Sequence, residues 1–405
     1  MTTFTNTFEF IGELRFGKEP VKVQEFDSGW TKKSIQLSVL ESKNNSMFVS
    51  LEGGYHKAKE NKVYSFTKGL FGEKGNQLVI DWDNRFDQDT IDSVADFKKT
   101  VVDLTVDEES KKKYYELRRE IRAIEDKKDA DEADSIKLAG LYEEARKTVP
   151  YRKEFLHQLD AVEYLEKISE KIQGKKFRVK GQIEASHWNG KNYISYNAQS
   201  FELVPDEYTN KLSANVELFF TKNSFDKSSF KKERKFYIDT YISQYSRDHE
   251  KDVFFPYNTI FNAQNHDDEN TKHLAHIDLV EDAFTVKGKS VFKQVFELRF
   301  VNGAEVVEVT VDNLTDKQKR MIDAGLAEPK DFVKTAFGDR VSENRIYVPI
   351  LKDLGKAGNY TEGAIETDYV EDDLTYVPVE RKEKETKVEE KPKKVIEISE
   401  DDLPF

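Results

Sequence analysis

Residues 30–39 read WTKKSIQLSV, and the second half of this stretch alternates strictly between polar and apolar side chains. An alternation with a period of two is typical of a β-strand with one buried face. The residues expected on the buried face are Ile35, Leu37 and Val39. Extending the same parity backwards places Trp30 and Lys32 on the outward, polar face. The stretch therefore predicts a sheet that keeps an aromatic ring and a cation on its solvent side.

The rest of the chain alternates between β and helical patterns. Residues 1–100 contain further short strands separated by glycine turns. From about residue 105 the apolar residues recur every three or four positions, which predicts a helix with a narrow apolar stripe. These residues are Tyr114, Leu117, Ile121 and Ile124. A further helix follows Pro150 and ends near Gly174.

Strand patterns return at about residue 176. Asn189-Gly190 is a strong signal for a type I′ hairpin turn. A third β block is expected to bury one face, made of Phe292, Phe296, Leu298 and Phe300. Residues 315–326 predict a short helix within this block. Beyond about Thr367 the composition is rich in Glu, Lys, Val and Pro without apolar clusters, which is typical of a disordered tail.

These patterns predict a mainly β protein, with multiple small OB-fold-like barrels, an α-helical insertion and a disordered acidic C-terminal tail. The predicted units are a first OB-like domain at 1–104, the helical insertion at 105–173, a second OB-like domain at 174–272, a third β domain at 273–366 and the tail at 367–405. A set of unrelated β-sandwiches has the same periodicity and stays open as an alternative.

Composition limits the class of protein. The chain has 405 residues and no cysteine, which excludes disulfides, thiolate zinc sites and cysteine nucleophiles and suits a reducing cytoplasm. The N-terminal residues contain neither a basic region nor the apolar core of a signal peptide. No apolar run approaches the ~20 residues that a membrane span needs. We therefore expect a soluble cytoplasmic protein.

The charge is distributed unevenly along the chain. The net charge of −13 argues against a polyanionic partner when taken as a sum. However, residues 366–405 carry 14 acidic and 7 basic groups, whereas residues 174–250 carry 13 basic and 10 acidic groups. The excess negative charge therefore lies largely in the tail, and one β segment is basic.

Enzyme and metal motifs are not found. There is no phosphate-binding loop, no G-x-S-x-G and no H-E-x-x-H. Asp81, Asp83, Asp87 and Asp89 resemble a calcium loop, but Phe86 stands where that loop needs glycine. The histidines at 266, 273 and 276 match no standard zinc spacing, so a surface loop is expected there. We predict a protein without enzymatic activity, cofactor or metal.

The basic stretch at 222–237 is the first candidate for a nucleic-acid contact. Its cations are Lys222, Lys227, Lys231, Lys232, Arg234 and Lys235, and its rings are Phe225, Phe230, Phe236 and Tyr237. Cations that neutralise phosphates beside rings that stack on bases are what single-strand binding needs. A charged loop over an aromatic core has the same composition, and both interpretations stay open.

Two tryptophans give a second candidate. Trp30 is followed by Lys32 and Lys33, and Trp188 is followed by Lys191 and Tyr193. Both tryptophans stand at turn-to-strand positions, and the adjacent lysines favour a ligand-facing role over a place in the core.

The chain ends on SEDDLPF at 399–405. This ending resembles the acidic tip of bacterial and phage single-stranded DNA-binding proteins, in which a disordered linker precedes aspartates, an apolar residue, Pro and Phe. The matching residues are Asp401, Asp402, Leu403, Pro404 and Phe405, with Leu where Ile is more usual. The resemblance implies that the Phe ring fills a pocket on a partner protein while basic residues hold the terminal carboxylate. The size of the body resembles the larger phage-encoded members.

These observations predict a phage single-stranded DNA-binding protein of the bacterial host cytoplasm, acting in DNA replication, recombination or repair. We expect it to coat DNA and to recruit replication or recombination proteins through its tip. One alternative is an interaction scaffold that docks through the same tip without binding DNA. A nuclease that uses Asp81–Asp89 is a third, but no base, nucleophile or phosphate loop accompanies those carboxylates.

Overall fold

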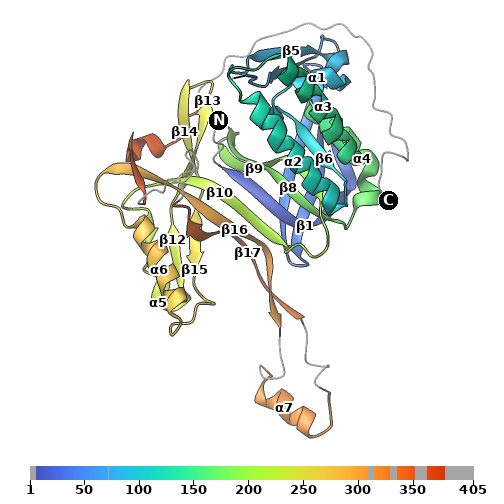
Figure 1. Ribbon diagram of the computed structural model, residues 1–405. Coiled ribbons are helices and arrows are strands. Elements are labelled where there is room, and N and C mark those ends of the chain that lie inside the picture. The colour runs from blue at the N-terminus through green and yellow to red at the C-terminus, as the bar shows by residue number, and fades with distance from the viewer. Residues whose placement is uncertain (1–5, 72, 309–313, 329–334, 352–362, 379–405) are drawn as a thin grey trace.

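The computed structural model describes residues 6–71, 73–308, 314–328, 335–351 and 363–378. It confirms a mainly β protein with one large, branched sheet (Figure 1). Residues 379–405, which contain the predicted tip, lie outside the described residues. No helix in the described part of the chain is long and apolar enough to cross a membrane.

The strands of the first half are β1 (Thr7–Glu25), β2 (Trp30–Ser42), β3 (Asn45–His56), β4 (Lys62–Phe66), β5 (Gln77–Asp81), β6 (Thr100–Asp103), β7 (Arg152–Phe155), β8 (Lys176–Trp188) and β9 (Lys191–Leu203). The strands of the second half are β10 (Lys211–Phe220), β11 (Phe225–Asp226), β12 (Lys235–Ile238), β13 (Tyr241–Ser246), β14 (Lys251–Pro256), β15 (Thr259–Asn262), β16 (Ser290–Glu308), β17 (Thr335–Pro349) and β18 (Ile365–Val370). The α-helices are α1 (Gln88–Ser93), α2 (Glu108–Glu125), α3 (Glu132–Thr148), α4 (Gln158–Ile172), α5 (Phe230–Glu233), α6 (Thr271–Phe284) and α7 (Asp316–Asp323). Within the described residues the 3-10 turns are η1 (Trp82–Phe86), η2 (Asp96–Lys98) and η4 (Glu371–Leu374).

Five strands of the first half close into a barrel. β1 pairs with β2, β2 with β3, β3 with β9, β9 with β8 and β8 with β1. The β3–β9 pair is parallel and the other four are antiparallel. Helix α4 stands between β3 and β8 in the chain and packs its apolar face into the barrel core. This strand order and helix position are those of an OB-fold.

A second, more open barrel repeats the same order. β10 pairs with β16, β16 with β17 and β12 with β15, all antiparallel, whereas β15 and β17 are parallel. Helix α6 occupies the place that α4 has in the first barrel, between the third and fourth strands. Among the described residues no pairing joins β10 to β12, so this barrel is incomplete on that side. Beyond the body, β16 and β17 extend toward α7 (Figure 1).

The structure groups the strands differently from the predicted units. β8 and β9 were assigned to a second domain beginning at residue 174, but they complete the first barrel. β10–β15 and β16–β17 were divided at residue 273, but together they form the second barrel. Residues Thr7–Ile11 of β1 pair with both β8 and β10 and so join the two barrels. One continuous apolar core runs through both, from Phe8 to Ile346.

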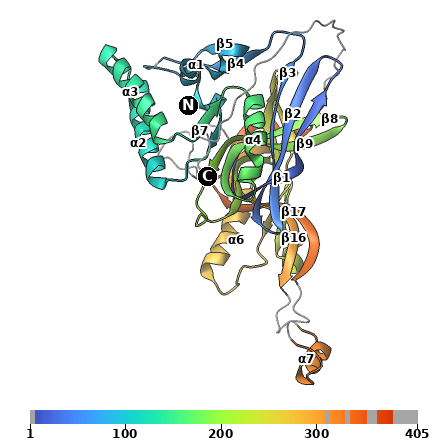
Figure 2. The same ribbon diagram turned by 90° about the vertical axis from the view of Figure 1, so that its right-hand side faces the viewer.

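The insertion lies between β3 and α4 and is not wholly helical. It contains the β4–β5 hairpin, α1, β6, α2, α3 and β7, and β6 extends the first barrel by pairing in parallel with β9. Helix α2 begins where the side chain of Asp107 accepts a hydrogen bond from the backbone of Ser110. Helices α2 and α3 bury a small core of their own and stand beside the barrel (Figure 2). The predicted helix after Pro150 is α4, which belongs to the barrel.

The local sequence predictions fare better than the unit boundaries. Ile35, Leu37 and Val39 are buried, and Asn189 and Gly190 have the positive φ angles of a type I′ turn, 48° and 75°. The tail prediction is wrong for residues 367–378. Strand β18 pairs with β16, and Tyr369 and Leu374 pack against an aromatic cluster of the second barrel.

Candidate nucleic-acid interface

A cleft separates the insertion from the first barrel. It consists of two adjoining cavities of about 770 and 660 Å³, which share Lys99 and Gln199 in their walls. Helix α2 lines the first cavity, and the β4–β5 hairpin lines the second. Strands β8 and β9 contribute residues to both, so the barrel surface forms a continuous floor.

The first cavity presents a row of cations on α2. Four residues at helical spacing line it and are exposed: Lys112, Tyr115, Arg119 and Arg122, here called the α2 stripe. The opposite side of α2 packs into the small helical core, which fixes the direction of the stripe. Lys112, Arg119 and Arg122 form no ion pair with any residue that the structure describes. Their positive charge therefore stays available to a ligand.

The second cavity presents aromatic rings. Four exposed rings lie at or beside it: Trp30, Tyr64, Phe66 and Phe97, here called the ring cluster. Tyr64 and Phe66 alternate along β4 with buried Val63 and Ser65, so that their rings point away from the hairpin core. The Nζ atom of Lys98 lies 5.3 Å from the centre of the Phe66 ring and 5.6 Å from that of Phe97.

Trp30 lies at the first turn of the barrel, as the sequence predicts for an outward position. A Cβ atom at Gly54 would come within 2.5 Å of the Trp30 ring, so only glycine at this position leaves room for the ring beside β3. The neighbouring cations are already engaged. The Nζ atom of Lys32 is 3.0 Å from Glu52, and that of Lys33 is 2.8 Å from Glu163 on α4. Trp30 thus lines the second cavity, whereas Lys32 and Lys33 line neither cavity and are each paired with a glutamate.

Trp188, Lys191 and Tyr193 lie at the other turn, between β8 and β9. Trp188 is 75% exposed, and Tyr193 and Lys191 are exposed beside it. The outward face of β8 runs from Lys180 through Gln182 and Glu184 to Trp188, so the cleft floor leads toward this turn. In OB-folds the turn between the first two strands and that between the last two flank the ligand face. The two tryptophans occupy those positions.

The basic stretch, here called the basic segment (222–237), behaves differently from its sequence interpretation. It leads from the end of β10 into β12 in the second barrel. Its phenylalanines are packed, whereas Tyr237 is exposed: Phe236 is buried, with Phe230 stacked 4.3 Å and Phe225 lying 5.0 Å from it. The charged-loop alternative therefore describes these phenylalanines correctly, because they complete the core.

Half of the cations in the basic segment have a carboxylate partner. Lys227 lies 2.6 Å from Glu281, Arg234 2.6 Å from Asp268, and Lys235 2.8 Å from Glu343. The last pair is mostly buried. Lys222, Lys231 and Lys232 are exposed and have no ion-pair partner among the described residues.

The aspartates at 81–89 and the histidines at 266–276 make structural contacts. Asp87 caps α1 by accepting a hydrogen bond from the backbone of Thr90 at 3.1 Å. His266 and His276 lie 3.0 Å apart between ring nitrogens, and His273 accepts from the backbone of Asp267. Among the residues that the structure describes, no three His, Asp or Glu side chains are grouped as metal ligands.

Sequence reasoning missed the α2 stripe and most of the ring cluster. The stripe recurs at positions 112, 115, 119 and 122, three or four residues apart, on the opposite face from the apolar stripe that was used to predict the helix. The alternation in KVYSF at 62–66 would have marked Tyr64 and Phe66 as outward residues. Their meeting across a cleft could not be read from either pattern.

Comparisons with known proteins add little to this geometry. No family model matches the chain, and no curated protein matches it. One similar solved structure is a crystal structure of a deletion mutant of the single-stranded DNA binding protein from Thermus aquaticus. The two chains are 8% identical with a TM-score of 0.30, over 75% of this chain and 89% of that one. A TM-score of this size does not show a shared fold.

Proposed function

We propose that this protein binds single-stranded DNA in the cleft between the first barrel and the insertion. The observation that carries the proposal is the cleft itself, in which unpaired cations of the α2 stripe adjoin the exposed ring cluster over an OB-like barrel. Cations neutralise backbone phosphates, and flat rings stack on bases of any identity. The combination suits an extended single strand, whose bases are open to stacking, better than a duplex.

A titration of fluorescein-labelled oligo-dT against the full chain tests the proposal. We expect salt-sensitive binding, weaker at about 200 mM than at about 50 mM salt, because bound cations release counterions from the strand. A duplex of the same length is the control and should bind more weakly, since its bases are already stacked. Absence of oligo-dT binding at the lower salt concentration would contradict the proposal and leave the interaction scaffold as the better function.

We extend the proposal to a cellular role from the sequence alone. The acidic ending at 399–405 supports recruitment of replication or recombination enzymes through Phe405, in the cytoplasm of a bacterial host that carries a phage. In this role the protein coats and protects DNA during replication, recombination or repair and has no enzymatic activity. The acidic tail occupies the cleft when no strand is bound, so that an arriving DNA strand has to displace it.

A further inference from the structure

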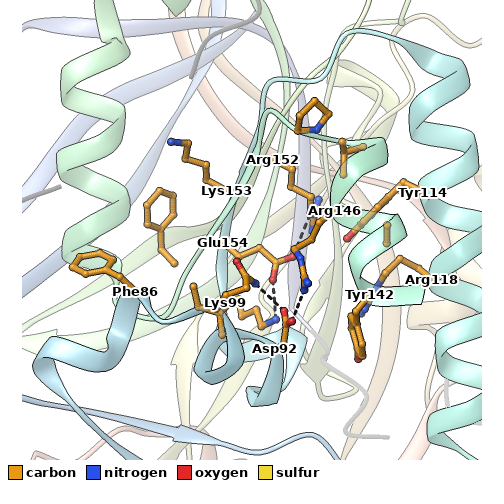
Figure 3. A pocket seen from close by; sticks show the side chains of 16 residues that line it. Phe86, Asp92, Lys99, Tyr114, Arg118, Tyr142, Arg146, Arg152, Lys153 and Glu154 are labelled. Atoms are coloured by element: carbon orange, nitrogen blue, oxygen red, sulfur yellow. Dashed lines mark hydrogen bonds and ion pairs between the residues drawn. The ribbon is translucent and has the colours of Figure 1, made fainter. Parts of the chain in front are cut away.

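The insertion side of the cleft is braced by ion pairs. Lys99, which lines both cavities of the cleft, also lines a smaller cavity of about 460 Å³ whose charged side chains are joined in pairs (Figure 3). Glu154 lies 2.7 Å from the Nζ atom of Lys99 and 3.2 Å from the guanidinium of Arg152. Arg146 of α3 pairs with Asp92 of α1. This wall of the interface therefore has its shape before DNA arrives.

The opposite end of the interface, which carries Trp188, has less support from its own sheet. β1 is a neighbour of β8 only as far as Gln182. Among the described residues, 184–188 and 191–195 pair only with each other. The end of the β8–β9 hairpin, here called the β8–β9 ribbon, is therefore two-stranded, and an isolated two-stranded ribbon is marginally stable in water. Other parts of the chain have to hold it if Trp188 is to keep one position.

Two segments from outside the first barrel support the β8–β9 ribbon. The backbone N–H of Ala185 donates to Oε1 of Gln244 on β13 at 2.7 Å. In addition, the ring centres of Tyr376 and His187 lie 4.8 Å apart. His187 and Trp188 are consecutive on β8, so their side chains point to opposite faces of the ribbon. Tyr376 thus supports the ribbon from the face opposite Trp188.

Tyr376 lies near the end of a strap that is fixed to the second barrel. This C-terminal strap (365–377) begins with β18, which pairs with β16. The ring of Tyr376 stacks on that of buried Phe255 of β14, with 4.9 Å between their centres. The backbone oxygen of Val377 lies 2.8 Å from Nε2 of His249, in the turn between β13 and β14. The Tyr376 ring is therefore held between the second barrel and the β8–β9 ribbon.

We infer that Tyr376 is a positioning residue for DNA binding, which fixes Trp188 at its end of the interface. The inference rests on the proposed function, since the position of Trp188 matters only if its ring stacks on a base. A ring that is already held in its bound position loses less conformational freedom on binding, and this raises affinity. Tyr376 acts on the strand only through the β8–β9 ribbon. Its effect on affinity therefore requires Trp188.

A double-mutant cycle with labelled oligo-dT and the full chain tests this dependence. Tyr376→Ala should lower oligo-dT affinity about threefold or more, because a loosely held Trp188 loses part of its stacking. In a Trp188→Ala background the same change should have no further effect, since the residue through which it acts is gone. Tyr376→Phe keeps the ring contacts and should bind like the wild type. His187→Ala removes the other ring of the contact, leaves the strap unaltered and should reproduce the loss.

The matched control is Tyr245→Ala. Tyr245 is 62% exposed and follows Gln244 on β13, so its side chain points away from the β8–β9 ribbon. This variant should keep the oligo-dT affinity of the wild type. Thermal midpoints are measured for all variants, and His187→Ala decides the matter if Tyr376→Ala lowers the midpoint.

Three results would overturn the inference. The first is wild-type oligo-dT affinity in Tyr376→Ala and His187→Ala. The second is a Tyr376→Ala loss that multiplies with the Trp188→Ala loss in the double variant. The third is an equal loss in Tyr245→Ala. Each of these defeats only the role of Tyr376, because the wild type still binds oligo-dT, whereas absence of wild-type binding defeats the proposed function itself.

Discussion

The α2 stripe and half of the basic segment are both cationic in the sequence but differ in their ion-pair partners in the structure. In the basic segment three cations face carboxylates within 3 Å and the interleaved phenylalanines are packed in or against the core. In the α2 stripe three cations have no carboxylate partner in the described part of the chain, and exposed rings lie across the adjoining cavities. The comparison teaches that a cation is available to a polyanion only when its neighbours in space, not in sequence, leave it unpaired.

The largest effect is expected from the α2 stripe. Replacing Lys112, Arg119 and Arg122 together by Ala removes three phosphate contacts of roughly 1.5 kcal/mol or more each. Affinity for oligo-dT should fall on the order of thousandfold if the three contacts add, and the slope of log affinity against log salt should fall by about 2. These side chains are exposed, so the thermal midpoint should not change. An unchanged salt slope would mean that the strand does not contact α2.

A smaller loss is expected from single rings of the interface. Trp30→Ala, Tyr64→Ala and Trp188→Ala should each cost about 1–3 kcal/mol of oligo-dT affinity, measured by fluorescence titration, because each removes one stacking platform. Phe48→Ala is the control, since Phe48 is 66% exposed but does not line the cleft. If Phe48→Ala weakens binding as much as Tyr64→Ala, the DNA strand does not follow the cleft.

The three paired cations of the basic segment should contribute still less. Replacing Lys227, Arg234 and Lys235 by Ala should change oligo-dT affinity less than threefold, because these cations are neutralised before DNA arrives. Glu343 keeps Arg345 at 2.7 Å when Lys235 is removed, which limits the structural damage. A salt slope that falls by about 0.7 for each lost cation would show that DNA displaces the carboxylates and would restore the original sequence interpretation.

The smallest effect on DNA binding is expected at the C-terminal end. Deleting residues 401–405 removes two aspartates and the terminal Phe, so oligo-dT affinity should stay constant or rise slightly as a competing anion is lost. The same deletion, and Phe405→Ala alone, should abolish capture of replication or recombination enzymes from host lysate, because one buried ring tends to dominate a short-peptide interface. Equal capture by the truncated and full chains would show that the tip is only a solvated end.

Local structure could be predicted from the sequence because local patterns determine it. The alternation at 34–39 gave the buried face of β2, the Asn189-Gly190 pair gave the hairpin, and the stripe from Tyr114 to Ile124 gave α2. Trp30 was placed outward by the same alternation, and Trp188 by its position at a turn beside Lys191. Each of these features depends on residues that are neighbours along the chain.

Barrel membership could not be predicted because it depends on distant pairs. β3 joins β9 through Ser50 and Asn197, and no local pattern links those residues. The predicted boundary at 174 therefore cut the first barrel in two. Which cations are free to bind DNA could not be predicted for a related reason. Lys227, Arg234 and Lys235 are neutralised by Glu281, Asp268 and Glu343, which all lie later in the chain.

The parallel pairing of β3 with β9 also has a consequence for synthesis on the ribosome. After the first three strands have been synthesised, roughly 150 further residues must be added before β8 and β9 can close the barrel. This takes on the order of ten seconds or more at usual translation rates. During that interval the open edge of β3 is exposed to pairing with other chains. The insertion contains mostly short-range contacts between α2 and α3 and can fold while the barrel waits. Shortening the insertion should therefore speed folding of the barrel, at the cost of the cleft.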